Sequence, residues 1–309
     1  MFKDQFMSMT ETTNLQSDHK GTIAAISVAL IWGLSFVAAR LILTTLSPVT
    51  LATTRFIIAS IIYTPIIIRE IPRGYKPNKN ELKDLCILGI LSISIYFWLQ
   101  YTGVQYAGAG ISAVLVTGLI PVLTGVISSL LLREKFTLIR GIKIIIGLIG
   151  VTLIAIPKLI FGQIDWLFFL GVGCLIGDAV CWAMYSTLSR KLIQKTGKPL
   201  MVTAYTTVLG TIFLIPMSLL GDWNAILKIS LGQWIAVFYL ALICSSVGYL
   251  LWNYALSRLE TVKASVWLYL EPIAAFIGEA ILFGVFPSSL TLLGGACIII
   301  SAILISREK

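Results

Sequence analysis

The sequence predicts an all-α integral membrane protein with ten transmembrane helices, built as two inverted five-helix repeats. Three observations lead to this prediction: a very apolar composition, apolar runs of membrane-spanning length, and an internal repeat. Of the 309 residues, 58% are hydrophobic and only 12% are charged, with a mean hydropathy of +0.94. Because a helix needs about 20 apolar residues to cross a bilayer, a chain of this composition has room for many spans.

Ten apolar runs follow one another along the chain, with short breaker segments at many of the joints. These breakers are Ser47-Pro48, Pro72 to Pro77, Gly108 to Gly110, Gly197 to Pro199 and Pro287 to Ser289. Proline and glycine at such places interrupt helices and favour turns. The predicted spans are residues 21–43, 48–68, 85–104, 109–132, 138–157, 168–189, 199–220, 231–256, 263–286 and 288–306.

The distribution of Lys and Arg predicts which ends of the spans face the cytoplasm. With the N-terminus inside, 19 of the 23 basic residues fall in cytoplasmic segments, and only Lys158 and Lys228 fall outside. Arg40 and Arg55 lie within or near the ends of spans. Since cytoplasmic loops carry an excess of positive charge, we expect a multi-pass protein with both termini in the cytoplasm.

Residues of the same kind recur at a spacing of about 150 positions. The matched pairs are Pro48 with Pro199, Pro65 with Pro216, Pro121 with Pro272, Trp32 with Trp182, Arg40 with Arg190, Tyr96 with Tyr249, Gln100 with Asn253 and Tyr101 with Tyr254. We therefore divide the chain into a cytoplasmic N-terminal tail (1–20), a first repeat (21–157), a linker (158–167) and a second repeat (168–306). Because five spans is an odd number, the second repeat enters the membrane from the opposite side.

An inverted repeat predicts a mechanism as well as a fold. Many secondary transporters are built from two such halves, related by a pseudo-two-fold axis in the membrane plane. The two halves can open toward either side of the membrane at similar energy, and the substrate site is expected between them near the midplane. We therefore expect transport by alternating access.

Several other classes of protein are disfavoured by the sequence. The net charge of +9 could indicate a nucleic-acid-binding protein, but the basic residues lie in short loops between apolar runs, so we expect no nucleic-acid partner. The only histidine, His19, is in the tail, and the five cysteines form no CxxC motif, so we expect neither a metal site nor a cofactor. There is no P-loop, dinucleotide-binding fingerprint or HExxH motif. We expect that the chain is not an enzyme.

Four short motifs give the chain a resemblance to a known family. They are Trp32-Gly33-Leu34-Ser35-Phe36, Arg55-Phe56, Trp182-Ala183-Met184-Tyr185-Ser186 and Tyr269-Leu270-Glu271-Pro272. In their order, and with ten spans, they resemble the EamA-type family of the drug/metabolite transporter superfamily. The resemblance implies exporters and permeases for amino acids and other small metabolites in the cytoplasmic (inner) membrane. Two places depart from the family pattern: Gly284-Val285 replaces a Gly-Glu pair, and Asp178 replaces an apolar residue.

The ninth span contains an acid and a proline within an apolar run. An acid within a membrane span is costly and is a functional hypothesis by default, so Glu271 is our candidate for proton coupling. In a regular helix, Trp267, Glu271 and Gly278 would share one face, which suits the wall of a cavity. The alternative is a carboxyl group that only locks the fold through a hydrogen bond. Pro272 alone is more simply a packing kink.

Further candidates for substrate binding lie in five other spans. They are Trp32, Arg55, Tyr96, Gln100, Asp178, Trp182, Tyr185, Tyr249 and Asn253, in addition to Trp267 and Glu271. The repeat supplies two Tyr-x-x-x-amide pairs, one from each half, and aromatic rings with amides suit a zwitterionic or aromatic molecule. Arg55 could pair with an acid or bind a substrate carboxylate. The alternative for each Tyr and Trp is packing, or the aromatic belt at the membrane surface.

The most consistent interpretation is a secondary transporter that exports small metabolites, such as amino acids or related amphiphilic compounds. Its expected partners are a small-molecule substrate and the lipid bilayer, and a homodimer is possible. The alternative is a membrane-embedded enzyme that modifies lipids, but the sequence offers little for a nucleophile or metal cluster. A sensor or scaffold without transport is the least favoured, since the loops are short.

Overall fold

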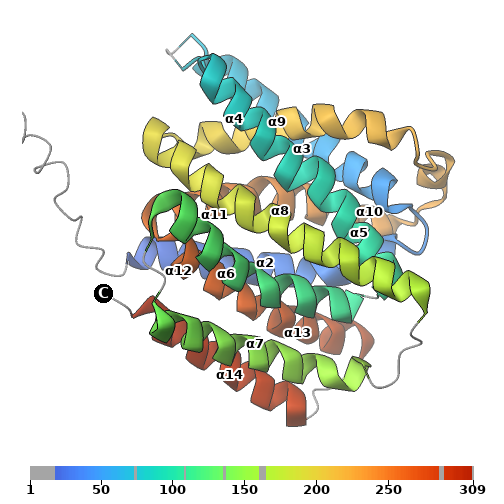
Figure 1. Ribbon diagram of the computed structural model, residues 1–309. Coiled ribbons are helices and arrows are strands. Elements are labelled where there is room, and N and C mark those ends of the chain that lie inside the picture. The colour runs from blue at the N-terminus through green and yellow to red at the C-terminus, as the bar shows by residue number, and fades with distance from the viewer. Residues whose placement is uncertain are drawn as a thin grey trace, which may run out of the picture.

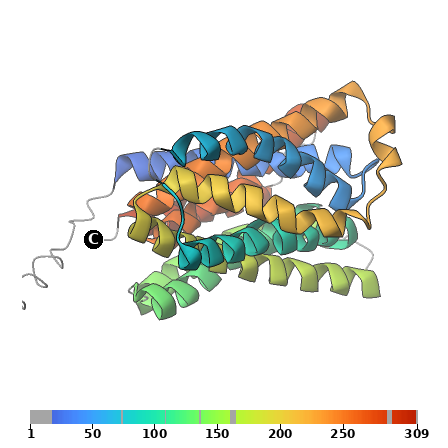
Figure 2. The ribbon, with the colours of Figure 1, turned by 90° about the horizontal axis from the view of Figure 1, so that it is seen from above.

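The structure is a computed structural model, and it describes residues 18–72, 75–107, 109–134, 137–159, 165–284 and 289–307. Within these ranges every regular element is helical. Of the predicted tail (1–20), residues 1–17 lie outside the described residues, and of the predicted linker (158–167), residues 160–164 do. Figures 1 and 2 show an elongated bundle whose long helices run roughly lengthwise.

The elements follow one another with short connections. They are α2 (His19–Ile42), α3 (Pro48–Glu70), α4 (Lys79–Gly89), η1 (Ile90–Ser94), α5 (Ile95–Ala107), α6 (Ala109–Leu132), α7 (Leu138–Leu159), α8 (Trp166–Thr196), α9 (Pro199–Ser218), η2 (Asn224–Lys228), α10 (Leu231–Phe238), η3 (Tyr239–Gly248), α11 (Tyr249–Arg258), α12 (Thr261–Ser265), η4 (Val266–Leu270), α13 (Glu271–Phe283) and α14 (Ser289–Ser306). Of the short elements, η1 and η3 are π-helical, whereas η2 and η4 are 3₁₀-helical.

Eight helical stretches among the described residues are long and apolar enough to cross a membrane. They correspond to the predicted spans one to four and six to nine. The helices α7 and α14 occupy the positions of the fifth and tenth predicted spans. The protein is therefore a helical, multi-pass membrane protein, and the total of ten spans stays a prediction.

The predicted breakers act as helix caps. The Ser47 side chain accepts a hydrogen bond from the backbone N–H of Thr50, with Pro48 in the first turn of α3, as expected at a helix start. Gly197 ends α8 in the left-handed conformation, with φ 66°. The helix α8 thus continues to Thr196, past the predicted end at 189, because Arg and Lys are good helix formers. The loss of apolar character marks the edge of the membrane and not the end of the helix.

The two halves pack against each other in a reciprocal pattern. The helix α2 of the first half packs on η3, α11 and α13 of the second half. Its repeat-equivalent in the second half, α8, packs on η1, α5 and α6 of the first half. The helices α3 and α9, which are equivalent to each other, pack together, and so do α7 and α14, which lie side by side in Figure 1. The Ser60 hydroxyl bonds that of Thr211, 151 positions away, at 2.8 Å. The equivalent residues of the two halves thus meet along a common line.

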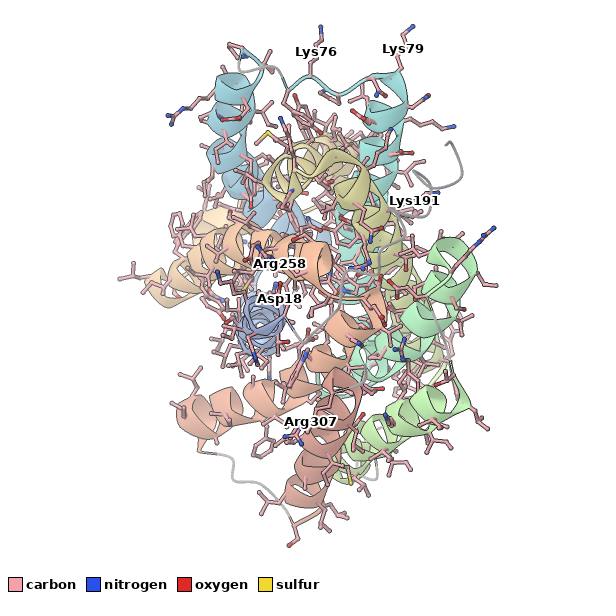
Figure 3. All side chains as sticks on the ribbon, turned by 90° about the vertical axis from the view of Figure 1, so that its left-hand side faces the viewer. Asp18, Lys76, Lys79, Lys191, Arg258 and Arg307 are labelled. Carbon is pink, nitrogen blue, oxygen red and sulfur yellow. The ribbon has the colours of Figure 1, made fainter. Side chains whose placement is uncertain are left out.

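One end of the bundle carries many of the basic side chains. Figure 3 looks onto this end, with Lys76, Lys79, Lys191, Arg258 and Arg307 labelled, and we call it the basic end. It is the end that the sequence assigns to the cytoplasm. Ion pairs at this end join residues from the two halves: Arg190 with Glu134 (3.1 Å), Arg140 with Glu260 (3.0 Å), Lys195 with Glu81 (3.3 Å) and Arg258 with Asp18 (2.9 Å).

Candidate substrate cavity

A small cavity of about 30 Å³ lies between the two halves. Its lining comes from α2, α3 and α5 in the first half and from α8, α11 and α13 in the second. The lining residues are Trp32, Ser35, Phe36, Arg55, Tyr96, Phe97, Gln100, Trp182, Tyr249 and Glu271. Such a space holds one or two water molecules, so the two halves must move apart to admit a metabolite.

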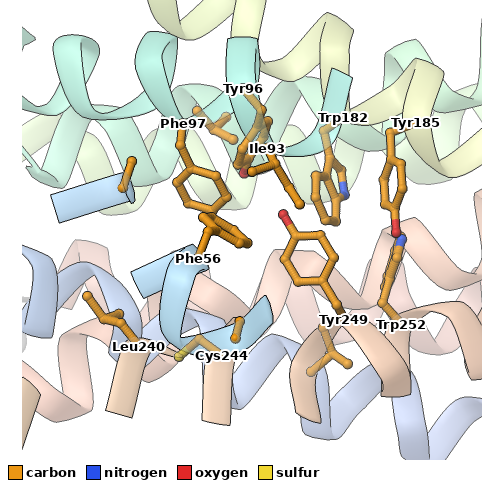
Figure 4. Packing of buried hydrophobic residues seen from close by; sticks show 14 of the residues in the cluster. Phe56, Ile93, Tyr96, Phe97, Trp182, Tyr185, Leu240, Cys244, Tyr249 and Trp252 are labelled. Atoms are coloured by element: carbon orange, nitrogen blue, oxygen red, sulfur yellow. The ribbon is translucent and has the colours of Figure 1, made fainter. Parts of the chain in front are cut away.

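Aromatic rings from both halves form the walls of the cavity. Trp32 and Trp182, which are repeat-equivalent, meet edge to face with their ring centroids 5.0 Å apart. Their neighbours Tyr96 and Tyr249, also repeat-equivalent, lie 5.0 Å and 5.6 Å from the ring of Trp182. Figure 4 shows the hydroxyl end of Tyr249 pointing between the rings of Tyr96 and Trp182. Two equivalent aromatic pairs thus surround the line along which the halves meet.

The π-helical segments fix several of these rings. A π turn changes the backbone hydrogen-bond pattern, which makes such segments frequent at functional sites. The carbonyl of Cys244, within η3, accepts a hydrogen bond from Trp32 Nε1 (3.1 Å). The carbonyl of Ser92, within η1, accepts one from the Tyr249 hydroxyl (2.7 Å). Since η1 and η3 occupy equivalent spans, each half anchors an aromatic side chain of the other.

Arg55 brings a buried positive charge to the cavity wall. Among the described residues its hydrogen-bond partners are neutral: Nε donates to Ser245 Oγ (2.8 Å) and Nη1 donates to the Tyr101 hydroxyl (2.7 Å). The guanidinium carbon also lies 4.5 Å from the ring centroid of Phe97 and 5.1 Å from that of Phe56, a favourable cation–π arrangement. The residue is only 3% exposed. Of the expected roles for Arg55, pairing with an acid is thus not seen in this structure.

Glu271 lines the same cavity with no hydrogen bond or ion pair to any residue that the structure describes, and it is 5% exposed. The expected lock on the fold through a hydrogen bond is therefore absent here. Glu271 stands in the first turn of α13, which α2 approaches closely. A Cβ added to Gly33 would come within 2.5 Å of the Glu271 carbonyl oxygen. The small residue at position 33 thus lets the two backbones meet beside the cavity.

The ninth span is not a continuous helix, which corrects the predicted stripe of Trp267, Glu271 and Gly278. The chain passes from α12 through the 3₁₀ segment η4 into α13. A 3₁₀ segment has 3.0 residues per turn, so residues four apart across it do not share a face. Trp267 lies in η4, is half-buried against two hydrophobic clusters, and does not line the cavity.

Seven of the eleven predicted site residues line the cavity: Trp32, Arg55, Tyr96, Gln100, Trp182, Tyr249 and Glu271. The other four, Asp178, Tyr185, Asn253 and Trp267, do not line it. Asn253 is wholly buried among hydroxyl groups. Its Nδ2 donates to Tyr185 and Thr203 at 3.0 Å and 2.8 Å, and its Oδ1 accepts from Ser189 at 2.7 Å. The amide of Asn253 is thereby occupied within the fold.

Asp178 lies in α8, one turn before Trp182. The residue is fully buried, and neither oxygen of its carboxyl group has a hydrogen-bond partner in the described part of the chain. The indole N–H of Trp182 is likewise buried and without a partner there.

Three lining residues were not predicted from the sequence: Ser35, Phe36 and Phe97. Ser35 and Phe36 follow Trp32 by three and four positions, so the helical period that selected other candidates could also have found them. Phe97 directly follows Tyr96, and no periodic signal marks it.

The described residues contain no group of three or more His, Cys, Asp or Glu side chains that could hold a metal ion. The five cysteines are all free thiols.

The chain is similar to known membrane transporters over nearly its whole length. The sequence model of the EamA-like transporter family matches it twice, at residues 19–156 and 169–307. An "Uncharacterized transporter" of Archaeoglobus fulgidus is 29% identical over 296 residues, which cover 94% of this chain and 99% of the relative. A "Probable terminal-alkyne amino-acid exporter" of Streptantibioticus cattleyicolor is 26% identical, with 94% of each chain covered.

The fold also matches a solved structure. A crystal structure of another protein aligns with a TM-score of 0.74 at 19% identity, and it covers 92% of this chain and 95% of its own.

Proposed function

Because this chain belongs to the EamA-like transporter family, we propose that it is a secondary transporter that exports small amphiphilic metabolites, such as amino acids. In this proposal the two halves are inverted five-span repeats. Their rocking exposes the cavity to one side of the membrane and then to the other. The basic end with both termini then faces the cytoplasm, in keeping with the excess of positive charge there.

The observation that carries the proposal is the presence of a guanidinium and an unpartnered carboxyl group on one aromatic cavity. Arg55 is held by neutral groups, so its charge is available to a carboxylate in the low-dielectric interior. The aromatic rings provide apolar surface for the body of an amphiphilic molecule. The relative named as an amino-acid exporter supports the same class of substrate.

The reciprocal packing of the halves supports alternating access. A rocking motion requires an interface that can be remade with the roles of the two halves exchanged. The contacts of α2 with η3, α11 and α13, matched by those of α8 with η1, α5 and α6, provide such an interface. The cavity lies where these contacts meet.

Glu271 is the proposed proton-coupling group. An acid buried within a membrane span and without a partner among the described residues is suited to a proton relay, as in many pumps and transporters. Other ionisable groups on or near the cavity include Arg55, Tyr96, Tyr101, Asp178, Cys244 and Tyr249. Export coupled to proton uptake would then require that Glu271 is reachable from one side at a time.

The test of substrate binding uses purified protein in proteoliposomes and a panel of labelled amino acids and related amphiphiles. We expect transport of at least one member, and we expect Arg55→Gln to reduce transport of carboxylate-bearing substrates by about tenfold or more. Arg69→Gln is the matched control, because Arg69 lies in the last turn of the same helix and is exposed. A folded preparation that neither binds nor moves any member of the panel would contradict the proposal.

The test of proton coupling is the pH dependence of transport. We expect Glu271→Gln to flatten the pH profile while substrate binding survives, because an amide keeps the shape and cannot titrate. Asp84→Asn serves as the control, since Asp84 is exposed on α4, far from the cavity along the chain. An unchanged pH profile in Glu271→Gln would remove Glu271 from the coupling role.

A further inference from the structure

Two buried polar groups lie unsatisfied on one face of α8. The carboxyl group of Asp178 and the indole N–H of Trp182 have no hydrogen-bond partner among the residues that the structure describes. Asp178 is 0% exposed and Trp182 is 2% exposed. Buried polar groups nearly always find hydrogen-bond partners. The Asp178 carboxyl group, an acceptor, and the Trp182 indole N–H, a donor, lie one helical turn apart without partners among the described residues. A ligand that bound there would supply a donor for Asp178 and an acceptor for Trp182.

Both groups are directed toward the cavity side of α8. Positions four apart share a face of a helix, so the Cβ of Asp178 points in nearly the same direction as that of Trp182, whose ring lines the cavity. Its neighbour Gly177 packs against α5, the helix that carries the lining residue Gln100. Leu99 of α5 contacts the place where a Cβ of Gly177 would lie, at 3.2 Å.

Asp178 lies close enough to the cavity acid Glu271 for their charges to interact. Its carboxyl group interacts electrostatically with Glu271, and with Tyr96 and Tyr249 on the cavity wall. None of these neighbours carries positive charge. Arg55, the cation on the wall, donates to the neutral Ser245 and Tyr101 and makes no ion pair with Asp178. Among the described residues no positive charge pairs with Asp178, so a cationic ligand would complement it.

We infer that Asp178 is a specificity-determining residue that binds the amine of the transported molecule. The ammonium group donates to the Asp178 carboxylate, and the Trp182 indole N–H donates to an oxygen of the same molecule. The carboxylate of that molecule lies at Arg55, and its apolar body lies between the aromatic rings. The substrate class is then a small molecule with a free amine, a carboxylate and an apolar or aromatic side chain.

This inference rests on the proposed function and adds a separate role for each charged residue. Arg55 holds the carboxylate, Asp178 selects the amine, and Glu271 carries the proton. A side chain rearrangement beside Trp182 must open the way to Asp178, which is enclosed in this structure. The inference thus also predicts that amine binding changes the environment of Trp182.

The test uses three probes with the same ring: phenylalanine, phenethylamine and hydrocinnamate, which carry both charged groups, the amine alone and the carboxylate alone. Binding to the purified full chain is measured by calorimetry and by ligand-induced thermal stabilisation. We expect the wild-type protein to bind the two amines more tightly than hydrocinnamate. We expect Asp178→Asn to weaken binding of both amines by about tenfold or more and to leave hydrocinnamate within about threefold.

Controls separate a binding role from a structural one. Cys174→Ala changes the preceding turn of the same helix and should leave all three affinities unchanged. Because Asp178 makes no hydrogen bond that an asparagine would lose, Asp178→Asn should unfold without ligand at a temperature no lower than the wild type. A variant that loses stability and affinity for all three probes equally would assign Asp178 a structural role and overturn the inference.

The wild-type protein alone also decides the question if the variant does not fold. Binding of hydrocinnamate as tight as that of phenethylamine would overturn the inference. Transport of the same probes in proteoliposomes then separates it from the proposed function. Amine binding that depends on Asp178 without any transport would refute the transporter and leave the binding site. Transport that Asp178→Asn leaves unchanged for the amines would refute only the role of Asp178.

Discussion

The two halves of this protein share a framework but use equivalent residues differently. In the first half, Gln100 and Tyr96 bond each other on the cavity wall (2.8 Å). Their equivalents in the second half separate: Tyr249 lines the cavity, whereas Asn253 lies buried among hydroxyl groups. The arginines differ too, because Arg190 is buried in an ion pair and Arg40 is exposed at the end of α2.

This comparison teaches that the repeat preserves backbone packing and not the role of each polar side chain. The rings of Trp32 and Trp182 stay equivalent in position and meet each other, although only the Trp32 indole N–H has a hydrogen-bond partner among the described residues. A polar group instead takes whichever partners lie within about 3 Å, and these partners differ between the halves. Glu134, for example, accepts from Arg190 and from the start of α12 at Thr261. The place equivalent to Glu134 is Val285, which lies outside the described residues.

The largest difference in stability between equivalent substitutions in the two halves should come from Arg190 and Arg40. Removing one member of a buried ion pair leaves the other charge uncompensated, so Arg190→Met should cost about 3 kcal/mol or more of unfolding free energy. Arg40→Met should cost roughly 0.5 kcal/mol or less, because Arg40 is exposed. The measurement is thermal unfolding in detergent. Equal losses for the two variants would mean that the arginines have kept one role.

The equivalent amide residues, Gln100 and Asn253, should differ less than the arginines, with one affecting mainly ligand affinity and the other mainly stability. Asn253→Leu strands the hydroxyls of Tyr185, Ser189 and Thr203, and we expect a loss of about 2 kcal/mol of stability. Gln100→Leu should affect stability less and ligand affinity more, since Gln100 makes one side-chain bond and faces the cavity. Unfolding and binding are measured for both variants. A loss of affinity in Asn253→Leu alone would reverse the assignment of the two roles.

The smallest effect concerns the ion pair between Asp18, at the start of α2, and Arg258 of α11, at the basic end. Partial burial would raise the pKa of Asp18. The hydrogen bonds from Arg258 and from the N–H groups of Gly21 and Lys20 outweigh it and hold the pKa below its ordinary value. A lowered pKa in the folded state means that the ion pair stabilises above the unfolded value, near about 3.9, and that this stability is lost as the pH falls through the folded value.

Asp18→Asn should therefore destabilise the protein slightly at pH 7, by roughly 0.5 kcal/mol or less for so exposed a pair. Wild type and variant should converge at a pH below the folded pKa, where both side chains are neutral. Unfolding temperatures of the two proteins across this pH range provide the measurement. A difference that grows toward acid pH would show that Asp18 acts through something other than its charge.

The sequence predicted the framework of the site better than its details. The 150-residue spacing identified Trp32 with Trp182 and Tyr96 with Tyr249, and all four line the cavity. The helical period failed at Trp267, because it assumes 3.6 residues per turn and the ninth span changes to a 3₁₀ segment there. The helical period also could not predict that Gln100 lines the cavity while Asn253 is buried. The period identifies residues on one face of a helix, but it does not say whether that face borders a cavity or packed side chains.

Composition, apolar run length and the internal repeat by themselves determined that this is a helical membrane protein of two related halves. These properties depend on the free energy of transferring whole segments from water into the bilayer. That free energy is a sum over many residues, so a wrong interpretation of one residue hardly changes it. Only the tertiary structure decided which polar groups are satisfied and which are left open. It gave Arg55 neutral partners, enclosed Asn253, and left Glu271 and Asp178 without bonds among the described residues. Hydrogen bonds depend on distances of a few tenths of an ångström between residues far apart in sequence.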